Sequence, residues 1–98
     1  MANISKAKRG KNRWIGLRIH QKPISRTILE VNLGKIMGDI NWKLFDLIDD
    51  DMHTLAILRT SLEDSLEAKK KINSIDGMST LTTSGKIRLV RQRLGIHK

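Results

Sequence analysis

The sequence predicts one α+β domain, and three observations lead to this prediction. Segments in which apolar residues alternate with other residues, as in strands, are interspersed with segments in which apolar residues recur every three or four positions, as in helices. The 98 residues are enough for one compact domain. With 39% apolar and 30% charged residues, the chain can build one modest core.

The totals also limit the class of protein. No apolar run approaches the roughly 18 residues that a membrane span needs, and the first residues lack the apolar stretch of a secretory signal peptide. Cysteine is absent, which excludes disulfides and cysteine-based metal sites. We therefore expect a soluble, cytoplasmic protein.

The first predicted element is a strand that begins at Arg13 and ends before Lys22-Pro23. Its residues alternate between two faces, one with Ile15, Leu17 and Ile19 and the other with Trp14, Gly16 and Arg18. Residues 1–12 lack periodicity and are rich in Lys, Arg, Asn and Gly, so we expect a flexible basic arm there. Residues 13–98 are then expected to form a single α+β domain.

A helix is predicted next, because apolar residues recur at helical spacing between residues 29 and 40. They are Leu29, Leu33, Ile36, Met37 and Ile40. Thr27-x-x-Glu30 resembles a capping box at the start of this helix, and Gly38 is suited to end it. Ile28 and Val31 lie off the apolar stripe, so the helix is expected to contact something on a second side.

A β-hairpin is predicted to follow the helix. Residues 41–48 and 54–59 are its strands, and Asp49-Asp50-Asp51 is the turn that joins them. Three consecutive acids could suggest a site for a hard cation. Consecutive residues at a strand end point in different directions, however, so a solvated hairpin tip is the favoured interpretation.

Both faces of this hairpin are largely apolar. A sheet covered by helices on one side only would leave Phe45, Leu47 and Leu58 in water. We therefore expect a partner protein on the open face, in contact with these three residues and with the spare side of the first helix, Ile28 and Val31.

A second helix is predicted between Ser61-x-x-Asp64, which resembles another capping box, and Asp76-Gly77. Its apolar stripe comprises Leu62, Leu66, Ala68, Ile72 and Ile75. A short Thr-rich strand over residues 78–83 leads into a last helix that opens at Ser84-Gly85. The resulting order, β-α-β-β-α-β with an extra C-terminal helix, is the split arrangement called ferredoxin-like. That fold hosts many functions and by itself names none.

The charge distribution favours nucleic acid as the ligand. The formal net charge is +9, which on so small a protein attracts polyanions. Residues 1–13 and 84–98 carry ten basic and no acidic side chains, whereas the residues between them carry nine basic and ten acidic ones. A merely solubilising surface would mix both signs throughout. We therefore expect both ends of the chain to contact RNA phosphates. Because the first and last strands are expected at opposite edges of the sheet, the two ends should form two separate basic patches.

Ser84-Gly85-Lys86 is the most specific candidate within these ends. A helix that begins there would offer free backbone N–H groups and the positive end of its dipole to an anion. Gly85 would allow close approach, and Lys86 would add charge. Ser84 acting only as a helix cap is an equally good interpretation of this feature alone. The basic residues that flank the last helix favour a phosphate.

Other candidate chemistry is weak. The three histidines are dispersed without metal-ligand spacing, and no nucleophile has a base and an orienting group beside it. We therefore expect no metal site and no catalytic residues. Trp14, Trp42 and Phe45 are the only aromatic residues other than the histidines. They lack the paired aromatic signature of an RNA-recognition-motif sheet, so base stacking on the sheet is not expected, and both Trp are assigned to the core or an interface.

Three stretches carry a family resemblance: Lys11-Asn12-Arg13-Trp14-Ile15, Leu55-Ala56-Ile57-Leu58-Arg59 and Leu81-Thr82-Thr83-Ser84-Gly85-Lys86-Ile87-Arg88. In order and spacing they resemble the archaeal and eukaryotic ribonuclease P protein component 2 family. The first is similar to the basic-aromatic opening of that family's first strand, and the second to its third strand. The third is similar to its closing Ser-Gly-Thr-Ile-Lys segment, with Lys86 in place of the usual Thr. With the element order, the resemblance covers residues 11–92, although the hairpin is short.

The resemblance implies a subunit of ribonuclease P, whose catalytic RNA removes the 5′ leader of precursor tRNA. It implies pairing with protein component 3, and such pairs can form a dimer of heterodimers. It implies no cofactor on the protein itself, with Mg²⁺ on the catalytic RNA and only indirect contact with precursor tRNA. The candidate RNA-binding residues are Lys8, Arg9, Lys11, Arg13, Arg59, Ser84, Gly85, Lys86, Arg88 and Arg91.

Two other classes stay open at this point. A ribosomal or ribosome-associated structural protein would share this size and charge, and sedimentation with ribosomal subunits would favour it. A small enzyme acting on a phosphorylated ligand at Ser84-Gly85 is the third class. It is disfavoured because no general base lies near that site in sequence.

Overall fold

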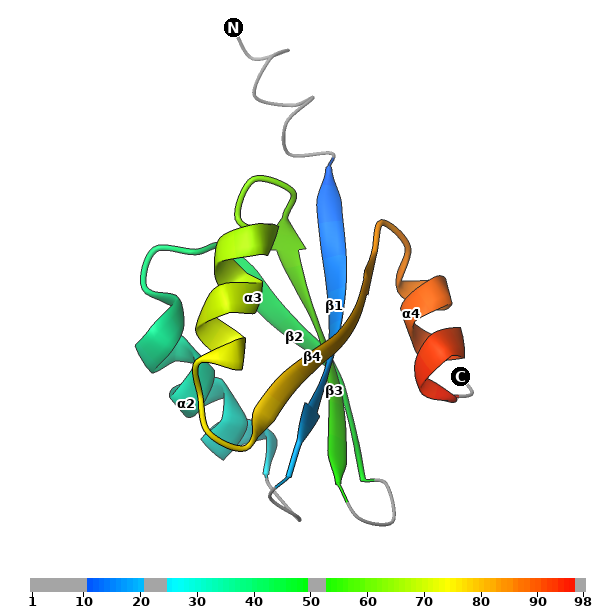
Figure 1. The fold of residues 1–98 in the computed structure, drawn as a ribbon, viewed down its shortest axis with the longest axis horizontal. Helices are drawn as coiled ribbons and strands as arrows, with labels where there is room; N and C mark the ends of the chain where they lie inside the picture. The colour runs from blue at the N-terminus through cyan, green and yellow to red at the C-terminus, as the bar shows by residue number, and fades with distance from the viewer. Residues whose placement is uncertain (1–10, 21–24, 50–52, 97–98) are drawn as a thin grey trace, which may run out of the picture.

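The computed structural model describes residues 11–20, 25–49 and 53–96. They form an α+β fold, as the sequence predicts, with a four-stranded antiparallel sheet and three helices (Figure 1). In chain order the elements are β1 (Asn12–Ile19), α2 (Arg26–Met37), β2 (Trp42–Asp49), β3 (Thr54–Ser61), α3 (Ser65–Asn73), β4 (Met78–Ser84) and α4 (Ile87–Leu94). This arrangement is compatible with the ferredoxin-like prediction. Residues 1–10 of the predicted basic arm lie outside the described residues.

The strands lie in the order β2-β3-β1-β4, and every neighbouring pair is antiparallel. β1 is therefore an inner strand, paired with β3 on one side and with β4 on the other. The prediction that the first and last strands occupy opposite edges is wrong, because the β1–β4 register runs from Trp14 opposite Ser84 to Ile19 opposite Met78. The start of β1 and the end of β4 consequently lie side by side.

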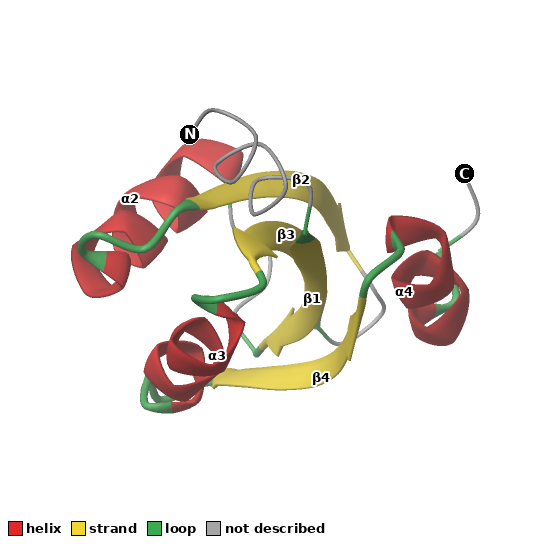
Figure 2. Ribbon diagram, turned by 90° about the horizontal axis from the view of Figure 1, so that it is seen from above, coloured by secondary structure: helices red, strands yellow, loops and turns green. Residues whose placement is uncertain are grey.

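Helices cover both faces of the sheet, with α2 and α3 on one face and α4 on the other (Figure 2). The larger core, between the sheet and α2 and α3, contains Ile15, Leu17, Ile19, Leu29, Leu33, Met37, Leu44, Ala56, Leu58, Ala68 and Ile72. The smaller core contains Ile57, Val90 and Ile96, with Trp14, Ile48, Ile87 and Leu94 packed against it. The first strand alternates as predicted, but both of its faces are covered by a core. Ile15, Leu17 and Ile19 pack in the larger core, and Trp14 packs against the smaller one.

α4 approaches the sheet closely because Gly16 has no side chain. An ideal Cβ built on Gly16 would lie 2.9 Å from Val90 Cγ1 and 2.9 Å from Leu94 Cδ1. The helix is also tied to β2 by Arg91, whose Nε and Nη2 donate hydrogen bonds of 2.7 and 3.1 Å to the two carboxylate oxygens of Asp46. Asp46 is only 3% exposed, so an ion pair whose carboxylate is buried and whose guanidinium is partly exposed fixes α4 in place.

The assignment of side chains to the two sheet faces overturns part of the predicted partner face. Leu58 was expected on an open face, but it is fully buried in the larger core beneath α2 and α3. Leu47 packs half-buried against the same core, and Phe45 lies half-buried at the opposite face. Ile28 and Val31 on α2 remain 53% and 52% exposed, so they stay available to a partner.

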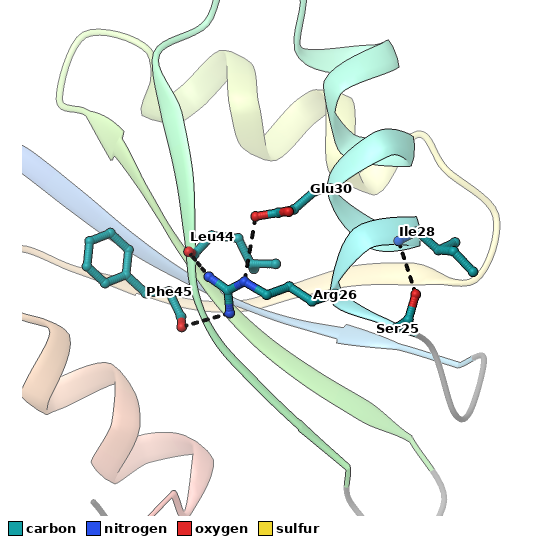
Figure 3. A network of polar contacts seen from close by, with 6 residues as sticks. All are labelled: Ser25, Arg26, Ile28, Glu30, Leu44 and Phe45. Carbon is teal, nitrogen blue, oxygen red and sulfur yellow. Dashed lines mark hydrogen bonds and ion pairs between the residues drawn. The ribbon is translucent and has the colours of Figure 1, made fainter.

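The start of α2 differs from the predicted capping box. Ser25 is the N-cap, and its Oγ accepts a 3.2 Å hydrogen bond from the N–H of Ile28, so Thr27 lies inside the first turn (Figure 3). The predicted end of α2 is confirmed, because Gly38 is the C-cap at a φ of 60°, a conformation that favours glycine. α3 begins after Asp64, three residues later than predicted, but Ser61 Oγ does accept the predicted hydrogen bond, of 3.2 Å, from the N–H of Asp64.

Arg26 connects α2 to the edge strand β2 at a β-bulge (Figure 3). The pairing of β2 with β3 shifts between Leu44 and Asp46, which leaves Phe45 without a partner on β3. Arg26 donates one hydrogen bond from Nη2 to the carbonyl of Leu44 and another, of 3.3 Å, from Nη1 to the carbonyl of Phe45. Its Nε lies 3.6 Å from the Glu30 carboxylate. These bonds satisfy the bulge carbonyls and fix the backbone that directs the Phe45 ring.

Candidate nucleic-acid interface

Four residues form one row across the sheet, at the end where β1 begins. The register places Lys43 of β2 opposite Arg59 of β3, Arg59 opposite Trp14 of β1, and Trp14 opposite Ser84 of β4. Direct cross-strand partners project from the same face of a sheet. Here it is the α4 face, because Trp14 packs against the smaller core. Two cations, an indole ring and the last residue of β4 therefore share one surface.

Phe45 joins this row because of the β-bulge. The ring centroids of Trp14 and Phe45 are 4.7 Å apart, and the rings meet edge to face at 81°. Lys43 Nζ lies 5.5 Å from the centre of the Phe45 ring, and the guanidinium carbon of Arg59 is also 5.5 Å from that centre. At such distances a cation is attracted to the ring face. An aromatic pair thus holds two cations at this end of the α4 face.

The two basic ends of the chain meet beside this row. Because Trp14 pairs with Ser84, Arg13 is brought next to Gly85, where the chain leaves β4. An ideal Cβ on Gly85 would lie 3.3 Å from Arg13 Nη1, so the guanidinium rests against this glycine. Lys11 and Lys86 flank the contact along the chain and are exposed. The expectation of two separate basic patches is therefore wrong for the described residues.

We call this end of the sheet the basic end. It consists of Lys11, Arg13, Trp14, Lys43, Phe45, Arg59 and Lys86. Arg13 precedes Trp14 in β1 and so projects from the opposite face of the sheet. The ion pairs Arg26–Glu30, Lys71–Glu67 and Arg91–Asp46 involve other cations. Cations gathered at one end of the sheet raise the local positive potential and favour a polyanionic ligand.

Arg91 has a different environment from the basic end. Its hydrogen bonds to Asp46 raise the pKa of Arg91 above the ordinary value, partial burial opposes the rise, and Coulombic attraction to the same carboxylate adds to it. Arg91 therefore serves to attach α4 to β2. A contact between Arg91 and RNA would compete with this ion pair. The position of Arg91 therefore argues against its predicted RNA-binding role.

The junction between β4 and α4 excludes one predicted interpretation. Ser84 is the last residue of β4, and its Oγ accepts a 3.2 Å hydrogen bond from the N–H of Lys86. Lys86 occupies the N-cap position of α4 and makes no side-chain cap hydrogen bond, so Ser84 is not the helix cap. Arg88, in the first turn of α4, is exposed. Lys8 and Arg9 lie outside the described residues.

Three members of the basic end were not assigned to RNA from the sequence, and one of them, Trp14, was assigned to the core or an interface. Lys43 belongs to the nearly neutral middle of the chain, and Phe45 was assigned to a partner protein. Alternation alone places Lys43 on the face opposite Leu44. The neighbours of Lys43 on that face depend on the strand register and on the bulge in β2. No local pattern in the sequence indicates the register or the bulge.

Other candidate sites are weaker. Within the described ranges no three His, Cys, Asp or Glu side chains gather as a metal site. His20 and His53 form an edge-to-face ring pair with centroids 5.1 Å apart, at the opposite end of the sheet from the basic end. None of the helices in this part of the chain is long and apolar enough to cross a membrane.

Comparison with known proteins assigns no relative to the chain. No family model matches it, and no curated protein matches it significantly. The function of the basic end is therefore argued from its own residues, two cations at the Phe45 ring and three more where β1 begins and β4 ends.

Proposed function

We propose that this protein binds RNA through the basic end and acts as a subunit of ribonuclease P, where it supports the catalytic RNA in removing the 5′ leader of precursor tRNA. The observation that carries RNA binding is the contact between Arg13 and Gly85, which joins the two acid-free ends of the chain in one surface. Lysine and arginine side chains that neutralise phosphates release counterions, and this release supplies much of the affinity for RNA.

The width of the surface suits a polyanion. The row from Lys43 on β2 to Ser84 on β4 crosses all four strands of the sheet. Three spacings of about 4.8 Å between neighbouring strands make a surface about 14 Å wide. Such a surface contacts more than one phosphate at once, which a site for a single small phosphorylated ligand does not need. This argues for RNA over a phosphometabolite.

The assignment to ribonuclease P rests on the three stretches that resemble component 2. Residues 11–15, 55–59 and 81–88 contribute to β1, β3 and β4, which are neighbours in the sheet. All three stretches supply cations to the basic end. The described residues of the basic end include no carboxylate or imidazole that could transfer a proton, which suits a protein that supports a catalytic RNA.

Four further statements belong to this proposal. The fold is ferredoxin-like, which the order β2-β3-β1-β4 with antiparallel neighbours supports. Ribonuclease P protein component 3 is the direct protein partner, and it contacts the exposed side of α2 at Ile28 and Val31. Mg²⁺ is held by the catalytic RNA. The protein acts in the cytoplasm.

Reconstitution of precursor-tRNA cleavage tests the proposal. We expect the protein, added with component 3 to the cognate RNA, to increase the rate of cleavage. The double variant Arg13→Gln/Lys86→Gln should require a higher protein concentration for the same rate, because it loses two phosphate contacts. The matched control is Lys69→Gln/Lys70→Gln, which removes the same charge from α3, outside the basic end.

Three outcomes separate the alternatives. No increase in cleavage with the unaltered protein refutes the ribonuclease P assignment. An equal loss in both double variants refutes a localised basic end and leaves only general surface charge. If the protein instead sediments with ribosomal subunits and brings down no other RNA, the ribosomal alternative takes the place of the proposal.

A further inference from the structure

We propose that the basic end binds an unpaired nucleotide, whose base stacks on Trp14 while Lys43 and Arg59 contact the adjoining phosphates. This inference rests on the proposed RNA binding and specifies which form of RNA the surface takes. It also reverses the sequence-based expectation that no base stacks on this sheet.

The aromatic pair lies at the open end of the α4 face. Val90 and Leu94 of α4 sit over Gly16, which is two residues along β1 from Trp14. Arg91 binds Asp46, which follows Phe45 in β2, whereas Lys43 precedes Phe45. α4 therefore covers the neighbouring rows of the sheet, and both Trp14 and Phe45 remain partly exposed.

The arrangement of the rings decides which of them receives the base. Two cations already lie 5.5 Å from the centre of the Phe45 ring. An edge-to-face pair occupies at most one face of one ring, and Trp14, although it packs against the smaller core, keeps part of its side chain exposed. Phe45 is therefore a positioning residue, which holds the indole and both cations, and Trp14 supplies the stacking surface.

The ligand class follows from this combination. Base–aromatic stacking tolerates any base, because every base has a π-face, and nearby cations track the backbone. In an A-form duplex the base faces are already stacked on one another, so a duplex offers the cations its phosphates but offers Trp14 nothing. A surface with both features favours a loop, bulge or single-stranded end of RNA.

Tryptophan fluorescence gives a direct test, because the two Trp lie on different sides of the sheet. Trp42 packs against the larger core, on the sheet face opposite Trp14, which packs against the smaller core. In the variant Trp42→Phe, Trp14 is the sole reporter, and we expect a short single-stranded oligoadenylate to quench its emission. A duplex of the same length should leave the emission unchanged. In the reciprocal variant Trp14→Phe, neither RNA should quench Trp42.

A second measurement separates the contribution of base stacking to RNA affinity from the contribution of charge. Phe45→Leu should weaken binding of the single strand at least about fivefold, as expected when stacking by one aromatic residue is impaired. The slope of log affinity against log salt should not change, because no charge is lost. Lys43→Gln and Arg59→Gln should each lower this slope by about 0.7. Lys70→Gln, on α3, should alter neither quantity.

The outcomes distinguish this inference from the function on which it rests. If single strands bind with a steep salt dependence but quench Trp14 no more than duplexes do, stacking is refuted and RNA binding stands. If neither form of RNA binds, the proposed function fails as well. If Phe45→Leu loses its circular dichroism signal through unfolding, the quenching of Trp14 in the Trp42→Phe protein decides the point alone.

Discussion

Gly16→Ala tests whether α4 is seated directly on β1. The added Cβ would lie 2.9 Å from Val90 Cγ1, 2.9 Å from Leu94 Cδ1 and 3.2 Å from Thr82 Cγ2. Non-bonded carbon atoms prefer separations of about 3.5–4.0 Å. Either these side chains change rotamer or α4 moves away from the sheet.

The size of the effect follows from which neighbours can yield. Leu94 Cδ1 is the end of a flexible side chain, whereas Val90 is β-branched and fully buried, so most of the strain falls on Val90. Overpacking of this kind costs about 1–3 kcal/mol. The lower entropy of the unfolded chain without glycine offsets about 0.4–1 kcal/mol. We expect a net loss of about 1 kcal/mol, which lowers Tm by about 4–8 °C in a domain of this size.

Thermal and urea denaturation, followed by circular dichroism, measure this loss. Gly34→Ala is the matched control, because an ideal Cβ at this exposed position in α2 lies 3.9 Å from Trp42 Cζ2, an ordinary contact. Replacing glycine by alanine inside a helix should stabilise the protein by about 0.5–1 kcal/mol. The two variants should therefore differ in sign. If Gly16→Ala is as stable as the unaltered protein, α4 does not sit on β1 as closely as described.

Three further predictions concern other contacts. Asp46→Asn removes the carboxylate that binds Arg91, and denaturation should show a loss of about 1–3 kcal/mol, since the partner guanidinium is partly solvated. The hydrogen bonds to Asp46 raise the pKa of Arg91 further above neutrality, so its ion-pair contribution is complete at neutral pH and is lost only in strong alkali. Titration of Arg91 should therefore not alter this loss near neutral pH. Arg13→Gln should lower the salt slope of single-stranded RNA binding by about 0.7 and Lys70→Gln should not, and equal slopes would remove Arg13 from the interface. Ser25→Ala should cost about 1 kcal/mol through loss of the α2 cap, and an unchanged Tm would show that another group caps the helix.

Local patterns in the sequence were sufficient for most of the secondary structure. The alternation of Ile15, Leu17 and Ile19 with Trp14 and Gly16 predicted β1, because a pleated strand turns successive side chains to opposite faces. The helical spacing of Leu29, Leu33 and Met37 predicted α2, and these three residues are buried in the larger core. Boundaries were less certain, because Ser25 and Thr27 can both cap a helix and only the backbone conformation at Ser25 selects it.

The errors concern contacts between residues that are far apart in the chain. The predicted partner face was wrong for Leu58, which is buried beneath α2 and α3. On the other face α4 returns to cover part of the sheet, with Arg91 reaching Asp46 across 45 positions of sequence. The place of Phe45 depends on a bulge in β2 that the alternation does not indicate, since the same residues are compatible with a regular strand.

The sequence by itself determined that the chain forms an α+β domain with acid-free basic ends, because composition and periodicity are properties of neighbouring residues. Only the tertiary structure decided that these ends meet. Arg13 and Gly85 are separated by most of the chain, and β1–β4 pairing brings them together. Strand order is set by which pairings bury the most apolar surface and satisfy the backbone hydrogen bonds of the whole sheet, and that balance is not written in any one segment.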